Sequence, residues 1–419
     1  MVKLKQIFAV IAVFLLGAVN AETILIKNAK VYTLGTQGTL EKADILIADG
    51  KITSVGTDIP AADGVKVVDA SGKHITPGLF NAHTQIGLTE IGAVDSTRDF
   101  RTSEKKAGAT FSPVQAFNPD STLISLNRAN GLTRAMLVPS VEKSILNGKG
   151  SIVNMTGSMD SVVLKDNAVY MNYGADSAEE GGGSRAMTLQ MIHEMFADLA
   201  SYDENAEDFK AKSSLKKDDA EALMPVFRGE IPLVVDVDRA SDIKAMLDLQ
   251  KQYNLKMVLS SAVEAWRLAG QIAEQGVAVL INPYSNLPSG FDTIGVRFDG
   301  AAILANAGVE LIISNRTSHK AYVLRESAGN AVTHGLDPEV ALKSISLTPA
   351  KWFGIGESFG SIEAGKDADL VIWDGDPLEI TSIPDAVYIM GEETSLVSRQ
   401  TRLRDRYMKD SDWPAAYNK

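Results

Sequence analysis

Residues 231–237 read IPLVVDV, a continuous apolar run that is followed at once by the helical stretch Ala240–Gln252. The same unit then repeats, with the apolar strand Lys256–Leu259 and the helical stretch Val263–Gln275. Continuous apolar strands that alternate with helices are typical of a parallel sheet that is covered on both faces. This stretch therefore predicts an α/β domain.

The same rhythm continues on both sides of this stretch. Further strands are expected at Leu79–Ala82, Arg134–Val138, Val277–Ile281 and Leu311–Ile313, and further helices at Gly300–Ala307 and Tyr322–His334. About eight strands close a (β/α)8 barrel of the TIM type, and residues 78–345 are long enough for one. Ser184, which follows three glycines, is the predicted N-cap of a helix that runs through Ala200.

The two ends of the chain are rich in β-type runs and turns. Residues 22–77 contain several short apolar strands, and Asp49-Gly50 between two of them predicts a hairpin turn with positive φ at both positions. Residues 346–395 return to the same pattern. We expect both ends to join in one small β domain, followed by a C-terminal tail at residues 396–419.

Residues 1–21 have the pattern of a secretory signal peptide. Two early lysines precede the apolar run Ile7–Leu16, and Val19-Asn20-Ala21 supplies small residues for cleavage. The alternative is an uncleaved membrane anchor. The pattern predicts a periplasmic or secreted protein that has no membrane association after cleavage.

The composition excludes several classes of partner and site. The whole chain carries a net charge of −12, so removal of the two lysines leaves −12 − 2 = −14. Such acidity argues against nucleic acid and anionic membranes as partners. The chain has no cysteine, which excludes disulfides, thiol nucleophiles and thiolate metal ligands. We expect a small-molecule ligand, and the sequence leaves a homo- or hetero-oligomer open.

Two segments carry a resemblance to a known family. Residues 68–85 read VDASGKHITPGLFNAHTQ, and residues 360–372 read GSIEAGKDADLVI. Together they resemble the amidohydrolase superfamily, in particular its exported imidazolonepropionase-like branch, over residues 23–407. The resemblance implies a (β/α)8 barrel with a β-sandwich built from both ends of the chain. It also implies hydrolysis of non-peptide C–N bonds, such as those of cyclic amides and amidines, with a divalent metal such as zinc at the barrel mouth.

The first metal-binding motif of that family is only half present. Residues i and i+2 of a strand point to the same face, so a His-x-His pair can hold one metal. Here His83 is present, but Gln85 stands where the second histidine belongs. A glutamine amide is a weaker zinc ligand than imidazole. His83 is therefore either a remaining metal ligand or a strand-end histidine.

The later motif positions depart further from the family pattern. Asp236 stands at the position where the family has a metal-binding histidine at the end of a strand. The sequence leaves three roles open for this aspartate: a metal ligand, a base or a strand-end cap. Thr317 stands where the resemblance places the catalytic aspartate, and a threonine is no general base. Arg316 adds a positive charge that opposes cation binding. His319 follows the last strand and is expected at the barrel mouth.

These residues leave two functions open. The first is hydrolysis of a small C–N substrate, with Asp236 and His319 as catalytic residues. The second is a metal-free relative that binds a ligand or partner without catalysis. No cofactor is predicted from the residues themselves. The residues expected to contact substrate are Gln85, Asn282, Tyr284, Asn286, Arg316 and Thr317.

Overall fold

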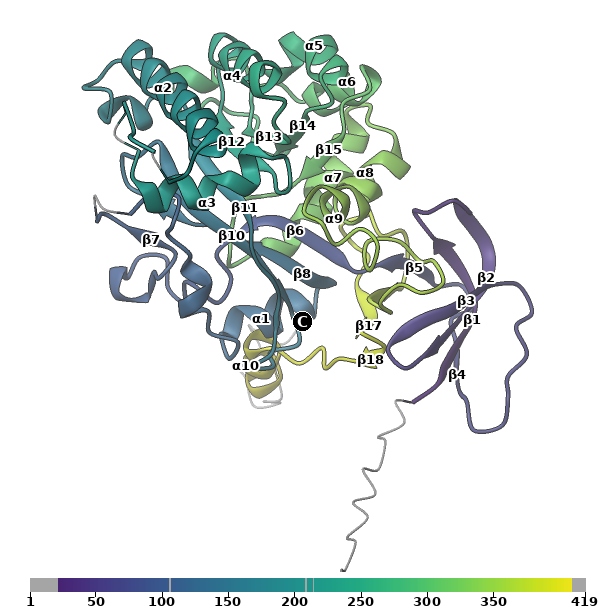
Figure 1. Ribbon diagram of the computed structural model, residues 1–419. Helices are drawn as coiled ribbons and strands as arrows, with labels where there is room; N and C mark the ends of the chain where they lie inside the picture. Colours follow the sequence, from purple (N-terminus) through teal and green to yellow (C-terminus); the bar gives the residue numbers. More distant parts are fainter. Residues whose placement is uncertain (1–21, 105–106, 208, 214, 409–419) are drawn as a thin grey trace, which may run out of the picture.

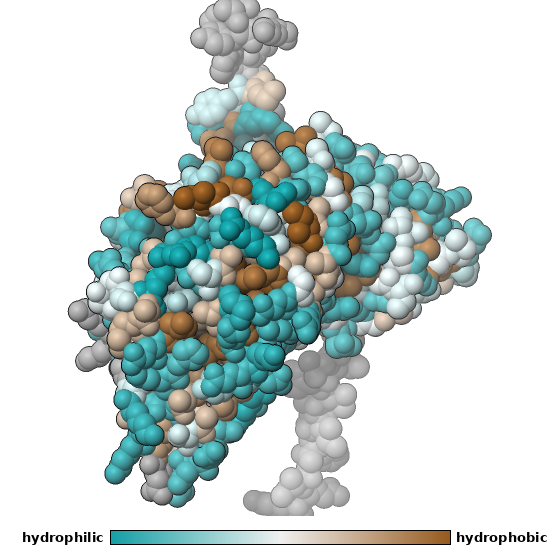
Figure 2. Space-filling model, turned by 90° about the horizontal axis from the view of Figure 1, so that it is seen from above, coloured by the Kyte–Doolittle hydropathy of each residue, from teal (hydrophilic) through white to brown (hydrophobic). Residues whose placement is uncertain are grey.

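The computed structural model of the protein describes residues 22–104, 107–207, 209–213 and 215–408. The predicted signal peptide, residues 1–21, lies outside this range, as do residues 409–419 of the predicted tail. Within the described part of the chain, no helix combines the length and the hydropathy needed to cross a membrane. On the face seen in Figure 2, brown apolar groups lie in small patches between hydrophilic residues.

An eight-stranded sheet in the order β15-β14-β13-β12-β11-β10-β8-β6 forms the centre of the molecule (Figure 1). Its strands are β6 (Leu79–Thr84), β8 (Leu132–Leu137), β10 (Leu146–Asn154), β11 (Val162–Asn172), β12 (Leu233–Val237), β13 (Met257–Ser261), β14 (Ala278–Ile281) and β15 (Leu311–Ile313). Between β15 and β6, the Asn81 amide donates to the Asn315 side chain at 3.1 Å, and the Ser314 hydroxyl donates to Asn81 at 2.8 Å. The sheet is thus a nearly closed barrel, and the predicted α/β barrel class is confirmed at this level.

One strand departs from the expected (β/α)8 pattern. β10 runs antiparallel to both of its neighbours, β8 and β11, whereas the other strands are parallel. Only residues 155–161 connect β10 to β11. A parallel crossover needs about a dozen residues or more, so this short connection forces a hairpin. The structure contains all the barrel strands expected from the sequence, together with this hairpin, which was not predicted.

Helices cover the outside of the barrel (Figure 1). They are α1 (Thr122–Arg128), α2 (Arg185–Glu204), α3 (Lys217–Phe227), α4 (Ala240–Tyr253), α5 (Ala269–Glu274), α6 (Gly300–Asn306), α7 (Leu324–Thr333), α8 (Pro338–Ser344), α9 (Leu347–Trp352) and α10 (Arg399–Tyr407). Ser184 caps α2 by accepting a hydrogen bond from the Met187 backbone at 3.3 Å, which confirms the predicted cap. A small two-stranded sheet joins β7 (Arg101–Thr102) and β9 (Ser140–Val141).

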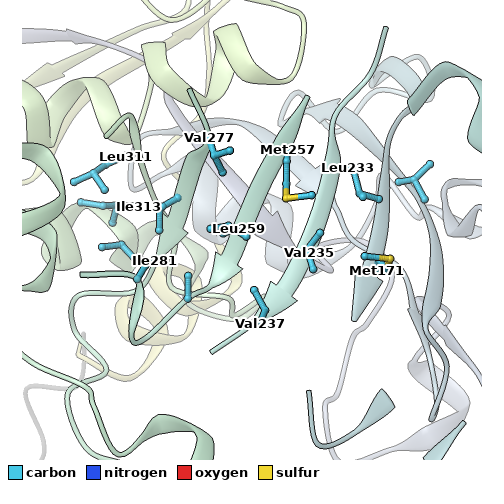
Figure 3. Close-up of a cluster of buried hydrophobic side chains, with 14 of the residues drawn as sticks. Met171, Leu233, Val235, Val237, Met257, Leu259, Val277, Ile281, Leu311 and Ile313 are labelled. Atoms are coloured by element: carbon cyan, nitrogen blue, oxygen red, sulfur yellow. The ribbon is translucent and has the colours of Figure 1, made fainter. Parts of the chain in front are cut away.

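The two faces of each barrel strand have different neighbours. Figure 3 shows alternate residues of neighbouring strands, among them Leu233, Val235 and Leu259, within the large cluster that also includes helix residues. The intervening residues, such as Val234 and Val258, form a second cluster inside the barrel. That inner cluster is completed by Phe353, Ile355 and Phe359, which follow α9 and lie beside Phe80 at the start of β6. The N-terminal end of the barrel is thereby closed, and only its C-terminal end is left for a site.

Strands from both ends of the chain form a second eight-stranded sheet, at the right of Figure 1. They are β1 (Ile24–Tyr32), β2 (Thr39–Ala48), β3 (Lys51–Gly56), β4 (Lys66–Asp69), β5 (His74–Pro77), β16 (Leu370–Trp373), β17 (Pro384–Ile389) and β18 (Glu392–Glu393). Asp49 and Gly50 join β2 to β3 with φ of 51° and 75°, which confirms the predicted hairpin turn. All of these strands belong to one hydrogen-bonded sheet, whereas the resemblance implied a sandwich of two.

A buried ion pair joins the barrel to this two-ended sheet. Arg134 of β8 is 2% exposed and donates to the two carboxylate oxygens of Asp369 at 2.9 and 3.2 Å. It also donates to Asp367 at 3.2 Å, and its guanidinium lies 5.3 Å from the centre of the Phe359 ring. The arginine therefore links β8 to residues 359–369, which are far away in sequence.

Candidate functional site

A polar cleft of about 880 Å³ opens at the C-terminal ends of the barrel strands. Strand ends supply His83, Tyr170, Asp236 and Ser260, and the segment after β15 supplies Arg316. Further lining residues come from neighbouring strand positions and from the segments around the mouth, including residues 173–177, the start of α2 and residues 289–293. The cleft is therefore placed where barrels of this kind carry their chemistry.

The strand alternation explains why the cleft has polar walls above an apolar floor. Val234 and Val258 are neighbours within the barrel, and Asp236 and Ser260 follow two residues later on the same strands. Side chains two residues apart share a face, so the polar pair lies above the apolar pair at the strand ends. On each of these two strands, the inward-facing side chain is therefore apolar at one position and polar two residues later, where the strand reaches the cleft.

Arg316 extends into the cleft from the segment after β15. Its backbone adopts the left-handed conformation, with φ of 53°, and its amide donates to the Ser314 hydroxyl at 3.3 Å. Its guanidinium forms an ion pair with Asp236 across the barrel mouth, and each side chain is 31% exposed. Burial opposes the charge, but the charge and hydrogen bond of Asp236, together with the charge of Asp238, contribute to a net rise in the pKa of Arg316. The cleft therefore holds a fixed cation.

His83 lies beside this cation as a neutral imidazole. The residue is 7% exposed, and its Nδ1 has no hydrogen-bond partner among the described residues. Burial, and then the charge of Arg316, lower the pKa of His83 well below its usual value. Its ring meets the Tyr170 ring edge to face, with 6.2 Å between the centroids.

Tyr170 and Ser260 add two more buried groups to the same cleft. Their exposed fractions are 5% and 1%, and neither hydroxyl has a hydrogen-bond partner among the described residues. Burial raises the pKa of Tyr170, so its hydroxyl keeps its proton. Burial also raises the pKa of Asp238, and the neighbouring Asp236 adds to that rise.

A second ion pair lies at the rim of the cleft. Arg185, at the start of α2, donates to Asp292 in the loop after β14 at 2.5 Å. The same arginine lies 3.5 Å from Asp242 of α4. Phe291, next to Asp292, is 93% exposed. The rim thus ties two helices, α2 and α4, to one loop and leaves an aromatic ring in solvent.

The donor set does not fit a divalent metal. His83 is one imidazole, and the side-chain oxygen of Gln85 already accepts a hydrogen bond from Ser318 at 3.1 Å. Asp236 is neutralised by Arg316, whose charge also opposes a cation. In the described part of the chain, no group of three or more His, Asp or Glu side chains is placed to hold a metal. Zinc sites normally need three or four such ligands.

Two residues expected near the catalytic centre lie elsewhere. Thr317 is not among the residues that line the cleft, and its carbonyl accepts a hydrogen bond from Thr84 at 3.2 Å. The ring of His319 is exposed, and its Nε2 lies within hydrogen-bonding distance of the Glu90 carbonyl oxygen, at 3.1 Å. The left-handed turn at Arg316 is the physical reason, because it directs the arginine, rather than the next residues, into the cleft.

The loop after β14 contributes differently than expected. Asn282, Tyr284 and Asn286 are not among the residues that line the cleft. Asn282 instead caps its own turn, since its side chain accepts from the Tyr284 amide at 3.2 Å and donates to Ser285 at 3.0 Å. The part of this loop that reaches the cleft is residues 289–293.

Several cleft residues were not predicted from the sequence. Tyr170 lies on β11, which was not predicted as a strand because the polar residues 165–167 interrupt its apolar pattern. Glycines interrupt the pattern of its partner strand, β10, in the same way. Two of the missed residues, Asp238 and Arg239, directly follow the predicted strand that ends at Val237, and Arg185 is the first residue of the predicted helix after Ser184. Their positions beside a strand end and at a helix start are the sequence signal that could have identified them as cleft residues. Of the predicted residues, the structure brings together His83, Gln85, Asp236 and Arg316 at one cleft.

Comparisons with known proteins point to one family. The model of the amidohydrolase family matches residues 242–397. The amidohydrolase tasK of Hapsidospora irregularis is 21% identical over 392 residues, which are 83% of this chain and 39% of that protein. A 5-methylthioadenosine/S-adenosylhomocysteine deaminase of Carboxydothermus hydrogenoformans is 44% identical over 73 residues, which are 17% of each chain. The chain spans less than half the length of these curated relatives.

Solved structures agree in fold. The crystal structure of an amidohydrolase from Thermotoga maritima MSB8 is 27% identical, with a TM-score of 0.79, over 89% of this chain and 99% of that one. Molinate hydrolase is 15% identical, with a TM-score of 0.54, over 90% of this chain and 95% of its own, which is a likeness of fold alone. Together these similarities support a relationship between this chain and the amidohydrolase family.

Proposed function

We propose that this chain is a hydrolase of the amidohydrolase family that acts on a non-peptide C–N bond of a small molecule, at a site built from protein groups in place of metal ligands. The observation that carries this proposal is the convergence of His83, Tyr170, Asp236, Ser260 and Arg316 on one cleft at the open end of the barrel. A cleft of about 880 Å³ is in the size range of small-molecule sites.

The cleft contains the groups that such a hydrolysis needs. A neutral His83 with a free ring nitrogen is suited to accept a proton from the attacking water and to return it to the leaving nitrogen. Arg316 and the protonated Tyr170 are hydrogen-bond donors that suit an oxygen-rich group of the bound substrate and orient it beside His83. Asp236 holds the guanidinium in place. In this scheme His83 is the base, in place of the Asp236 and His319 expected from the sequence.

A second function is favoured by one specific observation. The ion pair between Arg316 and Asp236 lies in the cleft, where a catalytic metal would otherwise be expected, and it leaves no free carboxylate base at Asp236. A site of this kind serves a binding protein equally well, because recognition needs no base. In that case the chain binds the same small molecules without turnover.

Hydrolysis assays on the purified protein separate the two functions. A panel of cyclic amides, amidines, imides and carbamates is offered with and without a chelator, and ammonia or amine release is measured. We expect chelator-resistant turnover of at least one compound, lost in His83→Asn and kept in the control His193→Asn on α2. Binding without turnover of any compound supports the second function, and turnover that the chelator abolishes contradicts the protein-group site.

We also propose the context in which this site works. The signal pattern supports export and cleavage after Ala21, which places the mature protein in the periplasm or outside the cell. The two-ended sheet supports a small β domain beside the barrel. We propose the boundaries 22–77 with 346–395 for that domain and 78–345 for the barrel.

A further inference from the structure

Three buried polar atoms in the cleft lack partners. They are Nδ1 of His83, the hydroxyl of Tyr170 and the hydroxyl of Ser260, and each residue is at least nine-tenths buried. Buried polar groups are nearly always hydrogen-bonded, and one left alone costs about 1–3 kcal/mol. Three such atoms around one cleft therefore indicate that a bound molecule completes them.

The chemistry of these groups restricts that molecule. The hydroxyls of Tyr170 and Ser260 present hydrogens, and Tyr170 remains protonated because burial raises its pKa. Arg316 has five N–H donors, and among the described residues only its Nη2 has a hydrogen-bond partner, Asp236. This part of the cleft is therefore rich in donors and calls for a ligand group that is rich in acceptors.

We propose that this donor set, formed by Arg316, Tyr170 and Ser260 beside His83, binds a carboxylate group of the ligand. A carboxylate offers two coplanar oxygens, which match the planar fork of a guanidinium. The inference deepens the proposed function and rests on it for the claim that the cleft takes small molecules. The substrate class is then a small C–N compound that carries a carboxylate, such as an N-acyl or N-carbamoyl amino acid.

The surrounding charges favour a monoanion over a more highly charged group. Acidic side chains outnumber basic ones by one along the cleft, which disfavours a phosphate dianion more than a carboxylate; the four acids are Asp176, Asp236, Asp238 and Asp292, and the three bases are Arg185, Arg239 and Arg316. Arg316 shares its charge with Asp236 through one terminal nitrogen, which leaves the other N–H groups of the fork for the ligand. A ligand with a single negative charge, such as a carboxylate, therefore matches the Arg316 guanidinium, which is only partly engaged by Asp236.

Binding of benzoate and of its neutral counterpart benzamide tests the inference without any need for turnover. Isothermal titration of the metal-free mature protein should show benzoate binding at least about tenfold tighter than benzamide, because a hydrogen bond to a charged group contributes more than one to a neutral group. Tyr170→Phe and Ser260→Ala should each weaken benzoate binding about tenfold or more. Tyr388→Phe, in the two-ended sheet, is the matched control and should bind like the parent protein.

Each outcome separates this inference from the proposed function. Benzoate binding that depends on Tyr170 and Ser260 supports the inference even if no compound in the hydrolysis panel turns over. Equal binding of benzamide and benzoate overturns it, as does unchanged benzoate binding in folded Tyr170→Phe and Ser260→Ala. Phosphate that binds more tightly than benzoate also overturns it, because the site would then select charge rather than a carboxylate.

Discussion

Replacement of Arg134 by methionine tests how the barrel and the two-ended sheet are held together. The change keeps much of the aliphatic bulk but removes the charge that faces Asp369, whose side chain is 1% exposed. It leaves the carboxylate with the Met390 backbone amide as a donor at 2.9 Å but without a counter-ion. Removal of one partner from a buried ion pair costs about 3–5 kcal/mol, because the other charge stays buried.

That loss is a large fraction of the free energy of unfolding of an ordinary protein, which is about 5–15 kcal/mol. Urea unfolding followed by circular dichroism measures it as a lower midpoint. The matched control is Arg228→Met, because Arg228 also donates through two nitrogens to one aspartate, Asp203, at 3.0 and 2.8 Å. That pair is 54% and 38% exposed, and its loss should cost about 0–1 kcal/mol. Equal effects of the two substitutions would refute the reasoning.

Three further predictions follow from particular residues. The folded-state pKa of His83 lies well below 6.5, so the unfolded chain binds more protons just below that pH, and stability should fall on acidification below about pH 6.5. His83→Asn should weaken this dependence in thermal melts from pH 5 to 8. Gly131→Ala should destabilise the fold by about 1–3 kcal/mol, because Gly131 has φ of 92° and a new Cβ would lie 2.8 Å from the buried β16 indole. Gly270→Ala in α5 meets nothing and should stabilise by about 0.5–1 kcal/mol in the same urea assay. N-terminal sequencing of exported protein should begin at Glu22, and an intact leader would contradict cleavage after Ala21.

The regular part of the fold could be predicted from the sequence because burial leaves a local signal. The strand at 233–237 carries apolar residues on both faces and only Asp236 as a polar residue, so its pattern is clear without knowledge of its neighbours. The hairpin of β10 and β11 has no such signal, since Asp166 interrupts β11 with φ of 52° and glycines interrupt β10. Tyr170 was missed together with its strand.

The candidate site was predictable only where spacing along one strand determines position. His83 and Gln85 lie two residues apart and reach the same cleft, as the alternation of a strand requires. Arg316 and Thr317 differ because one residue with positive φ reverses which side chain enters the mouth. Backbone reversals of this kind depend on tertiary contacts and leave no periodic pattern in the sequence.

The central claim, that protein groups stand where the family implies a metal, is tested most directly by the metal content of the purified mature protein. The protein is dialysed against chelator, then against buffer with zinc, and elemental analysis gives the metal retained per chain. Because His83 is one imidazole and Arg316 repels a cation, we predict far less than one zinc per chain and an unchanged urea midpoint in chelator. One zinc retained per chain, with a lower midpoint after chelation, would contradict the account.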